Sequence, residues 1–202
     1  MWQAEPVDPQ VAGRYIRTMS STTIAREEVE TLPILIAPHA TLKAKARPVG
    51  PADEAELRDL IPRMFATMYR APGIGLAAPQ VGRLLRAVTI DLMPGDKPSP
   101  IVLINPEIVA ATQELATREE GCLSLPGQYA DVTRPARVQV RYLDQQGTKQ
   151  EIEAEGLLSA CLQHEIDHLN GVLFVDHLSA LKRNMILRRL AKEQRQKRDD
   201  AR

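Results

Sequence analysis

The stretch Gln163-His164-Glu165-Ile166-Asp167-His168 decides how the rest of this 202-residue chain is interpreted. His164 and His168 are four residues apart, a spacing that places both imidazoles on one face of a helix, one turn apart. A metal ion held by both would have the Glu165 carboxylate beside it. H-E-x-x-H on a helix therefore indicates a metal site with a base at hand. The same pattern also arises by chance, which leaves ordinary core or surface histidines as the alternative.

The residues around this motif predict a buried helix. Leu157 to Asn170 are mostly apolar outside the motif and contain no Lys or Arg, and Gly171 follows. A helix with so little charge is expected in the interior of the protein. Glycine after the last turn is a common helix end. The motif is thus predicted to lie on a central helix, which is a rigid support for a site.

Period-two and short apolar patterns predict the strands. The chain has these candidates: an edge strand at Pro33–Pro38, strands at Ala87–Asp91, Ile101–Ile104, Val138–Tyr142 and Glu151–Ala154, and a hairpin turn at Asp144–Gly147. Strands and helices do not alternate regularly. The predicted fold class is therefore α+β, with mostly antiparallel sheets packed around the central helix that carries H-E-x-x-H, plus a C-terminal helix.

A second helix is predicted from Asp53, where Asp53 and Glu56 resemble a cap-like start. Its apolar residues follow at helical spacing and predict a stripe that faces the core: Leu57, Leu60, Ile61, Met64, Phe65 and Met68. Pro62 lies inside this run. An interior proline costs on the order of 3 kcal/mol, so we expect a kink or a late start.

The segment from Gly73 to Gly82 is rich in glycine and alanine. So little side-chain bulk allows another backbone to come close, and a tight turn is the plain structural alternative. A dinucleotide fingerprint is excluded, because G-x-G-x-x-G would need glycine at Ala78.

Composition and length predict one domain with extensions. We expect a poorly ordered extension at 1–30, for which Met19 offers an alternative start, a catalytic domain at 31–178, and a basic helix and tail at 179–202. The formal net charge is zero, which argues against a strongly basic nucleic-acid binder, although 181–202 holds nine basic and three acidic residues. Two cysteines, no long apolar run and no signal pattern predict a protein of the reduced cytoplasm.

Two protease families that use H-E-x-x-H lack a convincing third ligand here. A metzincin needs histidine where this chain has Phe174, and a thermolysin-like enzyme needs a downstream glutamate, for which only Glu193 in the basic tail is available. Upstream, Cys122 offers a thiolate that would join the two imidazoles and leave a fourth position open. Burial as a small apolar residue is the usual alternative for an isolated cysteine, and it is favoured for Cys161.

Three segments together resemble the peptide deformylase family. They are Gly73–Gln80 (GIGLAAPQ), Glu120–Ser124 (EGCLS) and Gln163–His168 (QHEIDH), and they occur in the family's order. The resemblance extends over about 32–190. It implies removal of the formyl group from the N-terminal formylmethionine of newly synthesised polypeptides, with release of formate.

The resemblance also implies roles for particular residues. Cys122, His164 and His168 match the metal ligands and Glu165 the catalytic acid and base, with Fe(II) as the expected native metal and Zn, Ni or Co as substitutes. Gln80 and the Leu123 backbone N–H match the groups that stabilise the oxyanion. Ile74, Gly75 and Gly121 match the backbone positions that hold the peptide as an added strand. Leu157 and Cys161, together with His164, match the lining of the methionine pocket.

Several points depart from the family pattern or extend it. Tyr129 stands where some members carry a basic residue, and Ala160 is smaller than the usual aliphatic residue. Glu120 and Arg134 match an ion pair beside the cysteine ligand. The C-terminal basic helix resembles that of bacterial members in which it docks near the ribosomal exit tunnel, so ribosome contact is expected. A metallo-endopeptidase and a metal-stabilised binding module are the alternative functions, and the presence of Glu165 disfavours the second.

Overall fold

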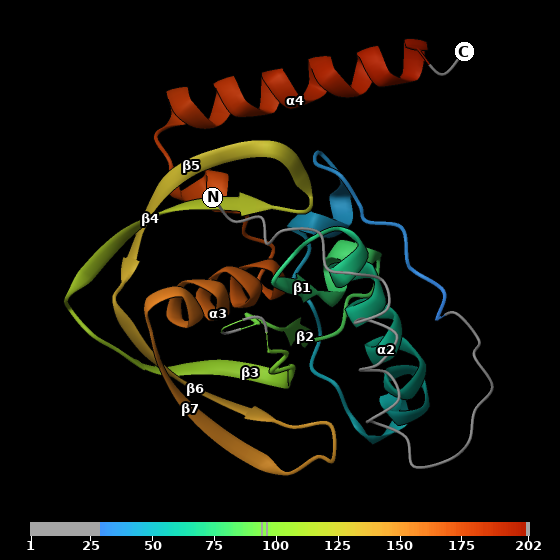
Figure 1. Ribbon diagram of the computed structural model, residues 1–202, viewed down its shortest axis with the longest axis vertical. Helices are drawn as coiled ribbons and strands as arrows, with labels where there is room; N and C mark the ends of the chain where they lie inside the picture. The colour runs from blue at the N-terminus through green and yellow to red at the C-terminus, as the bar shows by residue number, and fades with distance from the viewer. Residues whose placement is uncertain (1–28, 94, 96, 201–202) are drawn as a thin grey trace.

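The computed structural model describes residues 29–200 apart from 94 and 96, and its ribbon is shown in Figure 1. The α-helices are α2 (Glu54–Arg70), α3 (Gly156–Leu169) and α4 (Ala180–Asp200). The strands are β1 (Gly75–Ala77), β2 (Ala87–Ile90), β3 (Ile101–Ala111), β4 (Leu115–Cys122), β5 (Leu125–Pro135), β6 (Arg137–Leu143) and β7 (Lys149–Glu155). Short 3-10 helices are η1 (Ala40–Lys43), η2 (Pro51–Asp53), η3 (Ala78–Val81) and η5 (Phe174–His177). The predicted extension at 1–30 lies almost wholly outside the described residues.

The strands form two antiparallel sheets around α3, which confirms the predicted α+β class. One sheet has the order β1-β2-β3-β6-β7, and β4 and β5 form a separate pair. Figure 1 shows α3 enclosed between the two, with α2 on one side and α4 lying across β5. Ten of the fourteen residues of α3 are buried, as its lack of Lys and Arg predicted. The motif therefore does lie on a central helix.

α2 begins close to the predicted position and buries the predicted stripe. The late start that Pro62 suggested is wrong, because the helix runs through this residue without a break. Seven residues are buried on α2, and each large apolar side chain contributes about 1.5–3 kcal/mol, which outweighs a proline cost of about 3 kcal/mol. The predicted cap is also wrong: the Asp53 side chain makes no cap hydrogen bond to α2, but pairs with Arg47 and accepts the N–H of Gly50.

Two other predictions about elements need correction. Pro33–Pro38 forms no strand, because its backbone N–H groups reach two different partners: Leu35 donates to the Gln80 carbonyl and Ala37 to the Ser124 carbonyl. The sequence patterns also did not indicate β1, β4 and β5. The predicted hairpin is confirmed, with β6 and β7 joined by a turn in which Asp144 accepts the N–H groups of Gln146 and Thr148.

The apolar spacing in the sequence predicts Leu181, Met185, Ile186 and Leu190 near one face of α4, and two of these four, Ile186 and Leu190, do pack on the body. Leu190 is buried, and Ile186 and Leu187 pack beside it. Leu181 and Met185 were predicted to share this face, but they are 72% and 62% exposed. Successive residues on a helix are 100° apart, so positions 186, 187 and 190 share one face while 181 and 185 lie on the other side of the helix. None of the helices formed by the described residues has the length and apolar character needed to cross a membrane.

Candidate metal centre

The three predicted ligands converge. Cys122 ends β4, while His164 and His168 project from α3 on one face, as their four-residue spacing predicted. One potential ligand atom from each lies within 4.8 Å of the other two. Cys122 Sγ and His168 Nε2 are 3.2 Å apart. These three residues can therefore bind one metal ion, and a thiolate with two imidazoles suits Zn and Fe(II) alike.

Hydrogen bonding behind the ligands fixes His164. Its Nδ1 lies 2.9 Å from Glu120 Oε2, and both side chains are buried. Arg134 donates to both oxygens of Glu120, at 2.6 and 3.0 Å, which confirms the predicted ion pair. Carboxylates of this kind hold a ligating imidazole in one tautomer and orientation. Burial would raise the pKa of Glu120, but hydrogen bonds from His164 and Arg134 outweigh it and lower that pKa.

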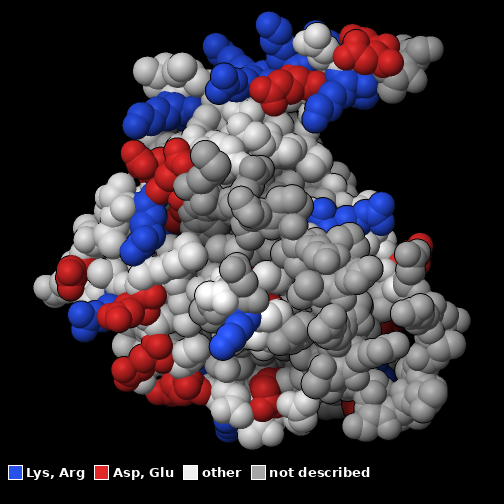
Figure 2. All heavy atoms as spheres, viewed as in Figure 1, with Lys and Arg blue, Asp and Glu red and all other residues white. Residues whose placement is uncertain are grey.

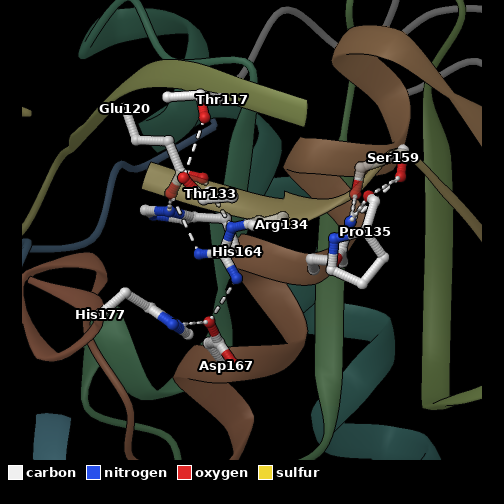
Figure 3. A network of polar contacts seen from close by, with 10 residues as sticks. Thr117, Glu120, Thr133, Arg134, Pro135, Ser159, His164, Asp167 and His177 are labelled. Carbon is white, nitrogen blue, oxygen red and sulfur yellow. Dashed lines mark hydrogen bonds and ion pairs between the residues drawn. The ribbon is translucent and has the colours of Figure 1, made fainter. Parts of the chain in front are cut away.

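The network continues outward to the surface. Arg134 Nη1 donates to Asp167 Oδ2 at 2.7 Å, and His177 Nε2 lies 2.7 Å from the same oxygen. Figure 3 shows these side chains in one connected group that runs from Glu120 and His164 to His177 on η5. The motifs did not predict Asp167 and His177, although Asp167 stands inside the quoted stretch beside His168. Its role depends on Arg134, which is 33 residues away in sequence.

The electrostatics of the two imidazoles suit a cation between them. Burial alone would lower the pKa of His164, but hydrogen bonds with Cys122 and Glu120 raise it well above its usual value. Burial and the adjacent His164 lower the pKa of His168. The surroundings of His164 thus favour a positive charge on its ring, while His168 stays neutral and available as a ligand. A metal ion can take the place of that single charge.

Glu165 lies beside the ligands without being one of them. Its side chain is buried, and burial raises the pKa of its carboxyl group to about 7. Glu165 Oε2 and His168 Nδ1 are buried atoms with no hydrogen-bond partner among the described residues. Buried polar atoms without partners are uncommon in native proteins. The one at Glu165 fits a site that is completed by a metal ion and its solvent, whereas His168 Nδ1 is not the ring nitrogen that lies near Cys122 and does not bear on metal binding.

A cavity of about 220 Å³ opens onto this centre. It lies between the edge strand β1 and the strand β4, and its lining includes eight of the predicted site residues: Ile74, Gly75, Gln80, Gly121, Cys122, Leu123, His164 and Glu165. His168 is buried and is not among the lining residues. Leu157 and Cys161, expected in the methionine pocket, are not among the lining residues, and Leu157 is exposed while Cys161 is fully buried.

Two glycines explain how the cavity keeps its shape. A side chain on Gly75 would collide with Oε1 of Glu165, and one on Gly121 would collide with the ring of Tyr129. The predicted close approach to the Gly73–Gly82 segment occurs at Gly75, but the neighbour is the Glu165 side chain and not another backbone. Tyr129 also lines the cavity, while Ala160 does not.

Gln80 is buried on η3 with its amide fixed at both ends. Its Oε1 accepts the N–H of Ala77 at 2.8 Å, while its Nε2 lies 3.2 Å from Ser124 Oγ and 3.6 Å from Cys122 Sγ. The donor end of the amide is thus directed toward the ligand group. Together with the cavity lining, this orientation is suited to stabilising negative charge next to the metal.

A buried H-E-x-x-H helix, a thiol ligand from a neighbouring strand and an adjacent glutamate define the class of metal-dependent hydrolases. Residues 31–184 match the family model described as polypeptide deformylase. The chain belongs to the peptide deformylase family, whose members remove the N-formyl group from nascent polypeptides. It is therefore a hydrolase that acts on formylated N-termini.

Individual relatives agree with this assignment. A peptide deformylase from Mesorhizobium japonicum is 55% identical over 161 residues, which cover 79% of this chain and 91% of that relative. One from Rhizobium meliloti is 50% identical over 161 residues, covering 79% and 92%. The crystal structure of a Legionella pneumophila peptide deformylase is 51% identical with a TM-score of 0.78, and the match covers 83% of this chain and 98% of that one.

Proposed function

We propose that Cys122, His164 and His168 hold the catalytic metal and that Glu165 is the general base and acid of deformylation. The convergence of the three ligand atoms, next in sequence to a buried Glu165 whose Oε2 has no partner within the described part of the chain, carries this proposal. When bound, the metal supplies Lewis-acid chemistry, which makes water more acidic and polarises the formyl carbonyl.

The residues of this chain then divide the remaining work. Glu165 takes a proton from the attacking water and delivers it to the amine that leaves, so that one formamide and one water give formate and a free N-terminus. Gln80 Nε2 and the Leu123 N–H donate to the developing oxyanion, each contributing roughly 3 kcal/mol in comparable hydrolases.

The formylated peptide is proposed to add to the free edge of β1. The Ile74 carbonyl accepts the N–H of Asp91 beside β2. Because successive residues of a strand present their backbone groups to opposite edges, those of Gly75 face away from β2. Gly75 supports pairing with an extended peptide on that side, with Gly121 of β4 across the cavity. Leu157 and Cys161 remain our prediction for the methionine side chain.

Assaying formyl-Met-Ala-Ser and its acetylated analogue tests the reaction class. We expect formate from the first peptide and no product from the second. Cleavage of an internal bond in either peptide would instead support a metallo-endopeptidase.

Fe(II) is our proposal for the native metal, with Zn, Ni or Co able to replace it. The donor set suits both iron and zinc. With iron, activity should decay in air as Fe(II) oxidises and the Cys122 thiolate becomes vulnerable. Anaerobic purification followed by elemental analysis checks this. Full zinc occupancy with high, air-stable activity would contradict it.

We also propose a cytoplasmic protein with a catalytic domain at 31–178, and ribosome contact through the basic helix α4. Figure 2 shows Lys and Arg side chains gathered along this helix at the top of the view. The exposed basic residues of α4 include Arg188, Arg189, Lys192, Arg195 and Lys197. The substrate emerges from a particle coated with RNA phosphate, to which such a surface is attracted in a salt-dependent way.

Neutralising three of these residues tests ribosome contact. Replacing Lys192, Arg195 and Lys197 with glutamine should abolish co-sedimentation with ribosomes at low salt while deformylation of a short peptide continues. The control replaces Arg137 and Arg141, two exposed arginines on β6, in the same way. Equal sedimentation of the α4 variant and the wild type would leave α4 as an ordinary solvated helix.

A further inference from the structure

α4 is connected to the wall of the cavity as well as to solvent. Gln128, on β5, lines the cavity and is only 2% exposed. Its Nε2 donates to both carboxylate oxygens of Glu193 on α4, at 3.2 and 3.4 Å. Leu190, less than one turn before Glu193, packs in one cluster with Leu125, which lines the same cavity. A polar contact and an apolar contact thus join the helix to one segment of the wall.

A second contact of α4 reaches the segment that contains Ala37. Gln194 Nε2 donates to the Ala37 carbonyl at 3.2 Å, and the Ala37 N–H donates to the Ser124 carbonyl at 2.9 Å. Ser124 in turn accepts from Gln80, the proposed oxyanion donor. Consecutive residues of α4 are therefore bonded to two chain segments that border the catalytic centre. Figure 1 shows α4 crossing above β5.

We propose that Glu193 is a positioning residue for the substrate cavity, acting through Gln128; this inference rests on the proposed assignment of the cavity as the peptide site. Gln128 precedes Tyr129, whose ring covers Gly121, its register partner on β4. The Gln128–Glu193 hydrogen bond fixes the part of β5 that sets the position of this ring. The ring in turn limits how a peptide approaches Gly121.

Loss of Glu193 would affect the cavity wall because the Gln128 amide, which it accepts from, is buried. A buried N–H₂ group that loses its acceptor is unfavourable, so Gln128 would rotate or the wall would shift to find another. Glu193 itself is exposed and is accompanied by Arg189 at 3.7 Å. Removing its carboxylate therefore leaves the core of the protein unchanged. The ligands of the metal also stay in place, because α4 does not contribute any of them.

Steady-state kinetics with formyl-Met-Ala-Ser test the proposal on the metal-loaded full chain. For Glu193→Ala we expect KM to rise roughly three- to tenfold, the effect of about one hydrogen bond, with kcat within about twofold of wild type. Glu193→Gln should restore KM, because its amide oxygen can accept the same N–H. Asp199→Ala removes an exposed acid of the same helix and is the matched control. Gln128→Ala reports on the wall itself.

The possible results distinguish the role of Glu193 from the assignment of the cavity as the peptide site. An unchanged KM in Glu193→Ala with a raised KM in Gln128→Ala would overturn the role of Glu193 and keep the cavity as the peptide site. An unchanged KM in both variants would overturn the cavity assignment too. Glu193→Gln as impaired as Glu193→Ala, or Asp199→Ala equally impaired, would show that charge on α4 matters and not this hydrogen bond.

Discussion

Glu165 is buried and lines the same cavity as Cys122 and His164, and its Oε2 has no hydrogen-bond partner among the described residues. Burial raises its pKa to about 7, which is the range in which a carboxylate can both accept and return a proton near neutral pH. A bound metal cation would lower that value by favouring the charged form. The properties of this residue thus arise from its surroundings, since an exposed glutamate would be a weaker base.

Glu165→Gln should retain the metal and lose nearly all turnover. The side chain is not a ligand, so metal content should stay close to that of the wild type, while formate release should fall about 10²- to 10⁴-fold. Elemental analysis and a formate assay measure the two quantities. Glu153→Gln, an exposed position on β7, is the control. A variant with more than about a tenth of the wild-type rate would exclude Glu165 as the general base.

The raised pKa of Glu165 also predicts how the metal-free protein responds to pH. The folded protein binds more protons at this group than the unfolded chain between the ordinary carboxyl pKa of 4.5 and about 7. Stability contributed by the protonated form is therefore present below this range and lost as pH rises through it. Urea unfolding of the metal-free wild type and Glu165→Gln at several pH values isolates this effect. The free energy of unfolding should fall more steeply in the wild type, and parallel curves would contradict the prediction.

Gly75→Ala tests the close contact between β1 and α3. The added methyl group would collide with Oε1 of Glu165, so the carboxylate must move from its present position. Misplacement of a catalytic group by about 1 Å can cost about 10²-fold in rate. We expect kcat to fall by about that factor while metal content is unchanged. Gly50→Ala is the control, because its added methyl group meets no neighbouring atom. Gly147→Ala is less suitable, because Gly147 has a positive φ that alanine adopts only with strain.

At the scale of the elements, the centre depends on contacts between β4, β5 and α3. β4 supplies Cys122 and Glu120, β5 supplies Arg134, and α3 supplies the two histidines and Asp167. Neither β4 nor β5 shows the alternation of apolar residues that is typical of a strand, because Glu120, Gln128 and Arg134 occupy most of their buried positions. Cross-strand pairing stabilises this hairpin where apolar burial is slight. Three elements must therefore dock correctly before the ligands meet.

Arg134→Ala should weaken metal binding. It removes the guanidinium that holds Glu120 and Asp167, and outer-shell partners of this kind typically contribute about 10- to 100-fold in metal affinity or activity. Competition with a chromogenic chelator measures the affinity. Arg137→Ala breaks an exposed ion pair with Glu155 and should have no effect. Equal affinities for Arg134→Ala and the wild type would reduce the pair to an ordinary structural contact.

At the scale of the whole molecule, the metal is expected to stabilise the fold. A ligand that binds only the folded state adds about 2.7 kcal/mol at one hundred times its Kd. Removing it with a chelator under anaerobic conditions should lower Tm, and adding the metal back should restore it. His168→Ala lacks one ligand, so its Tm should respond little to either step. An unchanged wild-type Tm after verified metal removal would contradict this coupling.

The sequence by itself determined the local chemistry of this protein. The spacing of His164 and His168, the missing charge on their helix and the apolar stripe of α2 all follow from the period of one helix, which needs no knowledge of distant residues. The class of fold followed from the order of such elements. The three family motifs also indicated Cys122 as the third ligand.

Only the tertiary structure decided which residues support those motifs. The links from Arg134 to Asp167, from Asp167 to His177, and from Gln128 to Glu193 join residues that no local pattern connects. The same holds for Pro33–Pro38, in which two N–H groups each donate to a different distant carbonyl. It also holds for the choice of which face of α4 is buried. The physical reason is that a polar side chain takes its partner from whatever packing brings near, and packing depends on the whole chain at once.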